Sequence, residues 1–482
     1  MIVPTDAQGL VTLPQANLVA RIAQRMVNFA ERWFPDAYVF VLIAVVVAAA
    51  GVMLHGGSPM AVSRAFGDGF WNLIPFTMQM ALVAIGGYVV ALSPPVAKLL
   101  TQLARLPRTG RGAVVFVGVL SILVSLLNWG LSLIFSGLLV KEIARRSDLR
   151  LDYRAAGAAG YLGLGCGFTL GITSSAAQLQ ANAASIPASL LPITGVIGFS
   201  ETIFTWQNGL TLLAVLTLSA GICHLTAPAP GAERTAAELG VALDAEGVTP
   251  KRPSRPGDFL EYSPILTLLV VALALGWLWQ TFSAGNPLIT LSGLNIYNFV
   301  FLILGILLHW RPRSLIEAFA KAMPSISGVL LQFPFYAAIA QMLTKVHNAS
   351  GTSLSDAVAH WFVGASGSPA VFSFLIGIYS SILGFFIPSA GGKWVIEAPY
   401  VMKAANEIGA HLGWTVMVYN IAETLPNFIN PFWMLPLLGI LGLKSKDLIG
   451  YTSIQFCIHF PIVMILAGAL MASFVYHPPI LP

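Results

Sequence analysis

A series of long apolar runs constrains this chain more than any other feature of its sequence. A helix needs roughly 20 mostly apolar residues to cross the hydrocarbon core of a bilayer. Runs near that length lie at 37–54, 72–92, 113–139, 155–180, 206–226, 262–282, 295–310, 325–345, 370–400, 412–440 and 450–475. Only 9% of the residues are charged, whereas soluble domains have about 25%. A soluble core could not cover this apolar surface, so we predict an all-α polytopic membrane protein.

Residues 227–259 differ from the rest, because they are rich in Ala, Pro, Gly and charge. We interpret them as a solvated linker between a first membrane repeat, 1–226, and a second, 260–482, which includes a connecting helix at 262–282. The three cysteines lie in separate runs without metal or redox spacing, so we expect no metal site. A net charge of +5 does not indicate nucleic-acid binding.

The distribution of basic residues predicts the topology, because cytoplasmic loops of membrane proteins are rich in Lys and Arg. With the N-terminus in the cytoplasm, all but four of the 25 Lys and Arg fall on the cytoplasmic side or in its loops. The four others are Arg64, Lys345, Lys393 and Lys403. This scheme leaves the C-terminus outside and favours a multi-pass protein of the bacterial inner membrane.

The run at 113–139 has basic clusters on both sides, which fits a re-entrant hairpin better than a simple crossing. The sequence Asn128-Trp129-Gly130 lies near its middle, where a hairpin needs its turn. A second hairpin is expected in 370–400, where Ile387–Trp394 contains Pro and adjacent glycines. Unpaired N–H groups at the helix start that follows could bind an anion.

An internal repeat is suggested by similar segments in the two halves. Gly51–His55 resembles Gly305–His309, and Gln79 and Gln332 follow at matching distances from a Phe. The two copies run in opposite directions in our topology. We therefore expect inverted repeats, the design of many secondary transporters.

Lys393 would add a positive charge within the membrane, where charges are costly and usually functional. The alternative is a snorkelling or salt-bridged lysine. Trp129 and Trp394 could form apolar walls for a short acyl chain, or could be ordinary packing residues. Glu397 and Glu423 could carry protons, or could be structural partners of the lysine.

Two further stretches predict broken helices, Gly163–Ser175 with its glycines and Glu423–Pro431 with two Pro and two Asn. Freed carbonyls and hydroxyls there could bind a coupling cation or a carboxylate. Close packing through small residues is the alternative for the glycines. The chain has no Walker A loop and no metal-spaced His or Cys set. We therefore expect a transporter rather than an enzyme, with no cofactor beyond Na⁺ or H⁺ for coupling.

The chain resembles the short-chain fatty acid transporter family, of the bacterial acetoacetate/butyrate permease type, over nearly its whole length outside the linker. The resemblance rests on Gly67–Asn72, Met78–Leu82, Asn128–Gly130, Gln332–Tyr336, Pro388–Gly392, Trp394–Ile396, Asn427 and Pro431–Trp433. The family's pattern has three glycines followed by His, whereas Ala390 and Lys393 stand here. A cation in place of His could change the charge preference for the substrate, so the resemblance does not assign acetoacetate or butyrate as the substrate of this chain.

The resemblance implies a secondary carrier of small monocarboxylates. The related ion-transporter superfamily implies paired hairpins and a homodimer that moves as an elevator. The residues that we predict to bind substrate are Asn128, Trp129, Gly130, Ser389, Gly391, Gly392, Lys393, Trp394 and Asn427. Those predicted near the coupling ion are Thr173, Ser174, Asn430, Glu423 and Glu397. Alternatives are a carrier of dicarboxylates or of amino-acid-like zwitterions, an anion channel, and a membrane enzyme that acts on lipid.

Overall fold

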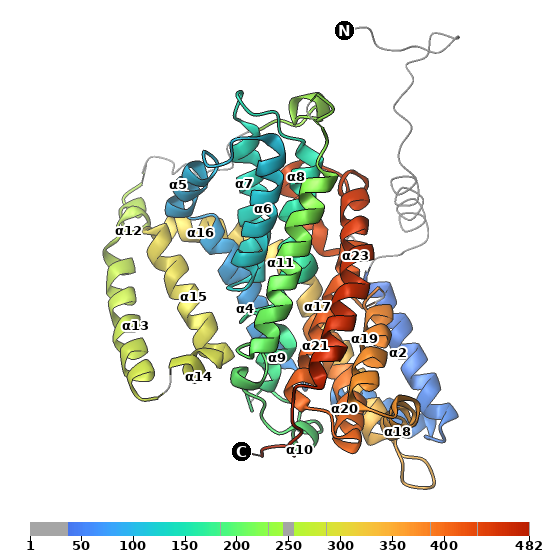
Figure 1. Ribbon diagram of the computed structural model, residues 1–482. Coiled ribbons are helices and arrows are strands. Elements are labelled where there is room, and N and C mark those ends of the chain that lie inside the picture. Colours follow the sequence, from blue (N-terminus) through green and yellow to red (C-terminus); the bar gives the residue numbers. More distant parts are fainter. Residues whose placement is uncertain are drawn as a thin grey trace, which may run out of the picture.

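A computed structural model describes residues 37–481 apart from 184, 230, 244–254, 286, 386 and 431 (Figure 1). The described part is nearly all helical, and its β structure is limited to two isolated bridges. The predicted all-α class is therefore confirmed. Arg21, Arg25 and Arg32, the basic residues of the N-terminal segment that we place in the cytoplasm, lie outside the described residues, as does Pro431.

The apolar runs form the long helices of the bundle. Within the described residues, six helices are long and apolar enough to cross a membrane, or seven if one bent pair is counted as a span. The helices that follow single runs are α2 (Ala37–Leu54), α4 (Ile74–Ala91), α11 (Trp206–Thr226), α13 (Ile265–Ser283), α15 (Leu294–His309), α17 (Ser327–Lys345) and α23 (Ser445–Met471). Their outer faces expose large apolar side chains such as Leu273 and Val46, as expected for contact with lipid.

Both predicted reversals are present as breaks between paired helices. In the first, α6 (Gly110–Ser125) and α7 (Trp129–Ala144) pack together, and the Ser132 hydroxyl donates to the Ser121 carbonyl at 2.7 Å. In the second, between α19 (Pro369–Gly384) and α20 (Ala390–Ile408), Lys393 Nζ donates to the Ser380 carbonyl at 2.8 Å. These contacts join residues on either side of each turn, so neither run is one continuous helix.

The two predicted broken helices are also interrupted where glycine or proline occurs. The first consists of α8 (Tyr153–Gly160), η1 (Gly163–Gly167), η2 (Phe168–Leu170) and α9 (Ser175–Gln180). The second consists of α21 (Leu412–Thr424), η6 (Leu425–Phe428), η7 (Phe432–Met434) and α22 (Leu435–Leu441), with a bend of 71°. Such breaks leave backbone groups without helical partners.

Several shorter helices were missed because their sequences are too polar or too short to resemble a span. The amphipathic ones are α3 (Pro59–Gly69), α5 (Pro94–Leu103), α16 (Pro312–Ala322) and α18 (Leu354–Ser366). The smallest are α10 (Leu191–Thr194), η3 (Phe199–Glu201), η4 (Ala237–Leu239), α12 (Asp258–Tyr262), α14 (Pro287–Ser292) and η5 (Met323–Ile326). The helices α3, α5 and α16 begin at a proline, which suits the first helical position because its missing N–H would be unpaired there anyway.

With the connecting helices α12–α14 and the small elements α10, η3, η4 and η5 set aside, the two halves share one order of elements: a long helix, a short amphipathic one, a long one, another short one, a paired reversal, a broken helix and a final long helix. Gln79 in α4 and Gln332 in α17 occupy corresponding elements. The halves are intermixed in one bundle, because α17 packs on α2 and α3, α15 on α4, and α23 on α11. Helix α13 stands at the edge beyond α15 (Figure 1).

Candidate functional site

A cavity with about 440 Å³ of empty space lies where the two reversals and the two broken helices meet. Its lining consists of Met80, Trp129, Leu164, Phe168, Ser175, Val329, Phe333, Ser389, Ala390, Gly391, Glu423, Asn427 and Trp433. Five of the predicted site residues are among them: Trp129, Ser389, Gly391, Glu423 and Asn427.

Two tryptophans form one wall of the cavity. Trp129 begins α7, and its ring meets that of Trp433 edge-on, with the centroids 5.4 Å apart. Trp433 Nε1 donates to the carbonyl of Pro388 at 2.5 Å. The wall therefore connects the turn of the first reversal to that of the second.

The start of α20 supplies a polar edge. Ser389 is the N-cap, and its hydroxyl accepts from the Gly392 N–H at 3.3 Å. The Gly391 N–H makes no hydrogen bond within the described part of the chain. A helix start with a free N–H attracts an anion.

Glu423 is the only charged side chain among the described residues that line the cavity. It is buried, and neither carboxylate oxygen has a hydrogen-bond partner within the described residues. The side-chain oxygen of Asn427, four residues later, also lacks a partner there. An ionised carboxylate without partners is costly in an apolar cavity.

Lys393 does not line the cavity. It is fully buried, and its ammonium donates to the hydroxyl of Ser380 at 2.6 Å and lies 3.1 Å from the Glu397 carboxylate. It also lies 4.7 Å from the centre of the Tyr419 ring. The salt-bridged alternative is thus the arrangement that the side chain adopts, and its direct contact with an anion remains a prediction.

Four other predicted binding residues lie behind the cavity wall. Asn128 caps α7 by accepting from Leu131 N–H at 2.9 Å, and its amide donates to Val83 and Tyr297. Gly130 lies so close to α4 that an added Cβ would be 2.7 Å from the Ala84 carbonyl oxygen. Gly392 and Trp394 pack against two tyrosines: a Cβ on Gly392 would lie 2.1 Å from the Tyr336 ring, and the Trp394 and Tyr419 rings are 4.5 Å apart.

Three of the residues predicted near the coupling ion connect elements instead. The Thr173 hydroxyl donates to the Ser125 carbonyl at 3.1 Å, and Ser174 caps α9. The Asn430 amide donates to the Phe385 carbonyl at 3.0 Å, which ties the second broken helix to the turn of the second reversal. Of the predicted ion-coupling set, Glu423 alone lines the cavity.

The apolar lining was mostly missed by sequence analysis. Leu164 and Phe168 lie in the predicted broken helix Gly163–Ser175, and Phe333 lies in the motif Gln332–Tyr336, but their apolar side chains carry no signal for a binding role. Val329 has no signal that distinguishes it from other residues of apolar helices. Trp433 could have been found, because it lies two residues beyond Glu423–Pro431, the stretch that predicted a helix break, and belongs to the motif Pro431–Trp433.

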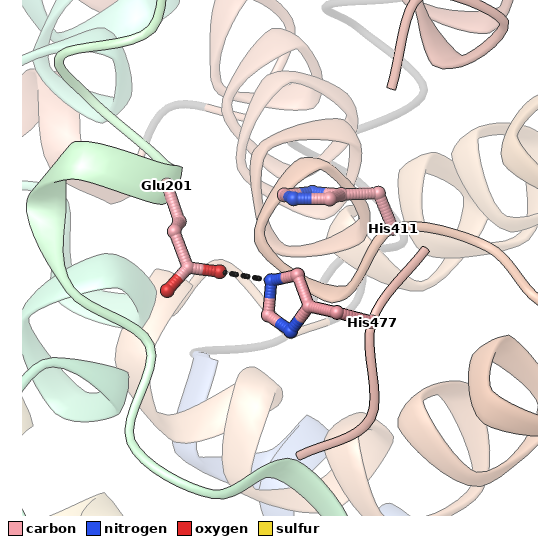
Figure 2. A group of neighbouring side chains, drawn as sticks. All are labelled: Glu201, His411 and His477. Carbon is pink, nitrogen blue, oxygen red and sulfur yellow. Dashed lines mark hydrogen bonds and ion pairs between the residues drawn. The ribbon is translucent and has the colours of Figure 1, made fainter. Parts of the chain in front are cut away.

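A separate cluster of Glu201, His411 and His477 lies at the end of the bundle where the C-terminus is found (Figures 1 and 2). His477 Nε2 is 2.8 Å from a Glu201 oxygen, and His411 Nδ1 accepts from the Trp414 N–H at 3.0 Å. These residue types can bind metals, but one His411 nitrogen already caps α21. We interpret the cluster as a clasp that holds the C-terminal tail.

The clasp predicts a pH dependence with two sides. The pKa of His477 is raised by its hydrogen bond to the Pro478 carbonyl and by Glu201. The stabilisation of tail docking by His477 is therefore present in acid and is lost as pH rises through the raised pKa. The pKa of His411 is lowered to about 4 by burial and by His477, so its contribution is lost as pH falls from its ordinary value toward that pKa. Docking of the tail should therefore be strongest between these limits, near pH 6.5.

A fluorine label on Ile480→Cys, in a Cys457→Ser background, would report the docked fraction of the tail by NMR. We expect His477→Ala to remove the loss of docking at alkaline pH. We expect His411→Asn, which keeps a capping side chain, to remove the loss of docking at acid pH. A docked fraction that does not change with pH would contradict this interpretation.

Comparison with known proteins agrees with this architecture. The profile of the family described as "Short chain fatty acid transporter" matches residues 18–471. A protein of Escherichia coli (strain K12) is 32% identical over 440 residues, which cover 90% of this chain and 96% of that protein. One from Haemophilus influenzae is 29% identical over 453 residues, covering 93% and 99%. Both bear the name "Putative short-chain fatty acid transporter".

Two solved structures share the fold at low sequence identity. Neisseria gonorrhoeae MtrF, described as illuminating a class of antimetabolite efflux pumps, has a TM-score of 0.59 and 15% identity, covering 95% of this chain and 100% of that one. The Alcanivorax borkumensis YdaH transporter has a TM-score of 0.52 and 17% identity, covering 92% and 100%. At these identities the likeness concerns the fold alone.

Proposed function

Because this chain belongs to the short-chain fatty acid transporter family, we propose that it is a secondary carrier, rather than an enzyme, that moves short-chain monocarboxylates across the bacterial inner membrane. The observation that carries the proposal is the cavity between the two reversals. It combines a mostly apolar wall with one polar edge, as a short acyl chain with one carboxylate requires.

In this proposal the acyl chain lies against Trp129 and Trp433, and the carboxylate lies at the start of α20. Ser389 and the free N–H of Gly391 are its donors, with the amide of Asn427 across the cavity. No Lys or Arg occurs among the described lining residues, which favours an anion with a single charge. A dicarboxylate would need a second set of donors.

Glu423 is the proposed coupling residue. An anionic substrate and an ionised Glu423 would repel each other strongly in a cavity that excludes water. One cation must therefore enter with each monocarboxylate. We favour a proton, which can be shared between two carboxylates, whereas Na⁺ needs several oxygen ligands and the described lining has few polar side chains.

The repeated order of elements supports alternating access by inverted repeats. Re-entrant hairpins at α6–α7 and α19–α20 would bring their turns to mid-depth from opposite faces, where non-helical backbone is tolerated because protein surrounds it. The expected orientation has the C-terminus outside. A homodimer remains part of the proposal through the superfamily resemblance.

Uptake of labelled butyrate by proteoliposomes tests this function. We expect saturable uptake that an inwardly directed proton gradient stimulates, and counterflow after preloading with unlabelled butyrate. Protein-free liposomes give the correction for butyric acid that crosses the lipid alone. Absence of protein-dependent uptake under proton and sodium gradients would refute the proposal, and currents without counterflow would indicate a channel.

A further inference from the structure

A second, larger space lies between α3–α4, α17, α20 and residues 185–189, with about 830 Å³ of empty volume. We call it the outer hollow, and its polar lining residues are Asn72, Ser185, Ser189, Gln341 and Lys345. Lys345 ends α17, is exposed, and is the only charged residue among the described residues that line the hollow.

The outer hollow belongs to the end of the bundle where the C-terminus lies. Lys345 precedes the loop to α18, and residues 185–189 lie between α9 and α10. Helices α9, α10 and α18 and the C-terminus are all at this end (Figure 1). In the proposed topology this is the outer side of the membrane.

A single aromatic layer separates the outer hollow from the inner cavity. Phe76 lines the hollow, and its ring stacks on that of Phe333 with the centroids 5.9 Å apart. Phe333 lines the inner cavity, as does Gly391, where an added Cβ would lie 3.0 Å from the Phe76 ring. The Phe76 ring therefore belongs to the hollow's lining and lies against two residues of the inner cavity's lining.

Lys345 differs from the other cations at this end. Lys403 Nζ lies 2.7 Å from the Asp356 carboxylate, and Arg64 lies 3.9 Å from that of Asp68. Within the described residues, Lys345 has no ion pair. A lone cation in a concave site raises the local concentration of anions.

We propose that the outer hollow is a vestibule in which the monocarboxylate first binds beside Lys345, and that Phe76 is the gate to the inner cavity. This inference rests on the proposed function and adds to it an outer binding step and a route. The polar lining solvates the carboxylate before it passes the aromatic layer, beyond which the free N–H of Gly391 receives it.

The role of Lys345 is tested by uptake kinetics in vesicles of known orientation. At low ionic strength, Lys345→Ala should raise the KM for butyrate added at the outer face by about fivefold. The difference should shrink in high salt, where charges are screened. Lys345→Arg should restore the wild-type KM, and Arg64→Ala is the matched control. An unchanged KM, or a change that is equal from both faces or independent of salt, would overturn this role.

The gate is tested without transport. Ser175 lines the inner cavity, so Ser175→Cys in a Cys457→Ser background places a thiol there, while Cys166 and Cys223 are buried. A small anionic methanethiosulfonate added at the outer face should modify this thiol severalfold faster when Phe76→Ala is also present. Phe362→Ala removes a buried ring away from both spaces and should have no such effect.

Equal modification rates with and without Phe76, or modification from the opposite face only, would overturn the gate. Because this labelling needs no substrate, it tests whether Phe76 blocks access to the inner cavity even if butyrate proves not to be transported. Failure of wild-type uptake would instead count against the proposed function.

Discussion

Replacement of Glu423 by Gln should abolish concentrative uptake of butyrate while butyrate–butyrate exchange continues. If one proton accompanies each monocarboxylate, a gradient of one pH unit supplies about a tenfold driving force for protein-dependent uptake of butyrate by the wild type. Gln has the shape of a protonated Glu but cannot release a proton, so the gradient should drive no protein-dependent net uptake in the variant. Initial rates of uptake and counterflow, corrected with protein-free liposomes, measure both quantities.

The stability of the Glu423→Gln variant provides an internal control. Because the Glu423 oxygens have no partners within the described residues, the neutral amide should fold at least as well as the carboxylate. A folded variant whose protein-dependent uptake, after subtraction of the protein-free rate, is still stimulated by the proton gradient would remove Glu423 from the coupling mechanism. If uptake is instead driven by sodium and Glu423→Gln abolishes it, Glu423 remains the coupling residue and the coupling ion is Na⁺ rather than a proton.

Replacement of Lys393 by Met should destabilise the protein by about 3–5 kcal/mol, the usual effect of breaking a buried ion pair. The reason is that Glu397, fully buried, would lose the ammonium that lies 3.1 Å from its carboxylate. The double variant Lys393→Met/Glu397→Gln removes the stranded charge and should recover most of the loss. Thermal unfolding of the purified wild type, both single variants and the double variant gives the coupling energy.

The same double variant distinguishes two roles of Lys393, an ion pair with Glu397 alone and a direct contact with the substrate. If the lysine only balances Glu397, the affinity of the double variant for butyrate should be close to that of the wild type. If Lys393 contacts the substrate, affinity should fall equally in the single and double variants. The second result would restore Lys393 to the binding site, against the arrangement described above.

The sequence was sufficient to predict the long helices, both reversals and both broken helices. The length of each apolar run predicts the long helices. The reversals occur where Asn128 and Ser389 cap a new helix within an apolar run. The helices α3, α5, α16 and α18 were not predicted, because their length and polarity are typical of loops.

The site was predicted less completely, for a physical reason. Polar residues in apolar runs are visible in the sequence, but whether each faces a cavity or a neighbouring backbone depends on packing. The Asn128 amide donates hydrogen bonds to Val83 and Tyr297. Lys393 donates to Ser380 and pairs with Glu397. The Glu423 carboxylate, in contrast, has no hydrogen-bond partner within the described residues. Contacts between elements far apart in the sequence decide these outcomes.

The position of the substrate is the most direct test of the central claim, that a monocarboxylate binds between the two reversals. A crystal of the protein grown with 4-bromobut-3-enoate, a four-carbon analogue whose vinylic bromine is not displaced by its own carboxylate, would locate the bromine by its anomalous scattering. We predict one peak in the inner cavity near Trp129 and Trp433, with the carboxylate at the start of α20. A peak elsewhere, with the inner cavity unoccupied by the analogue, would contradict the account.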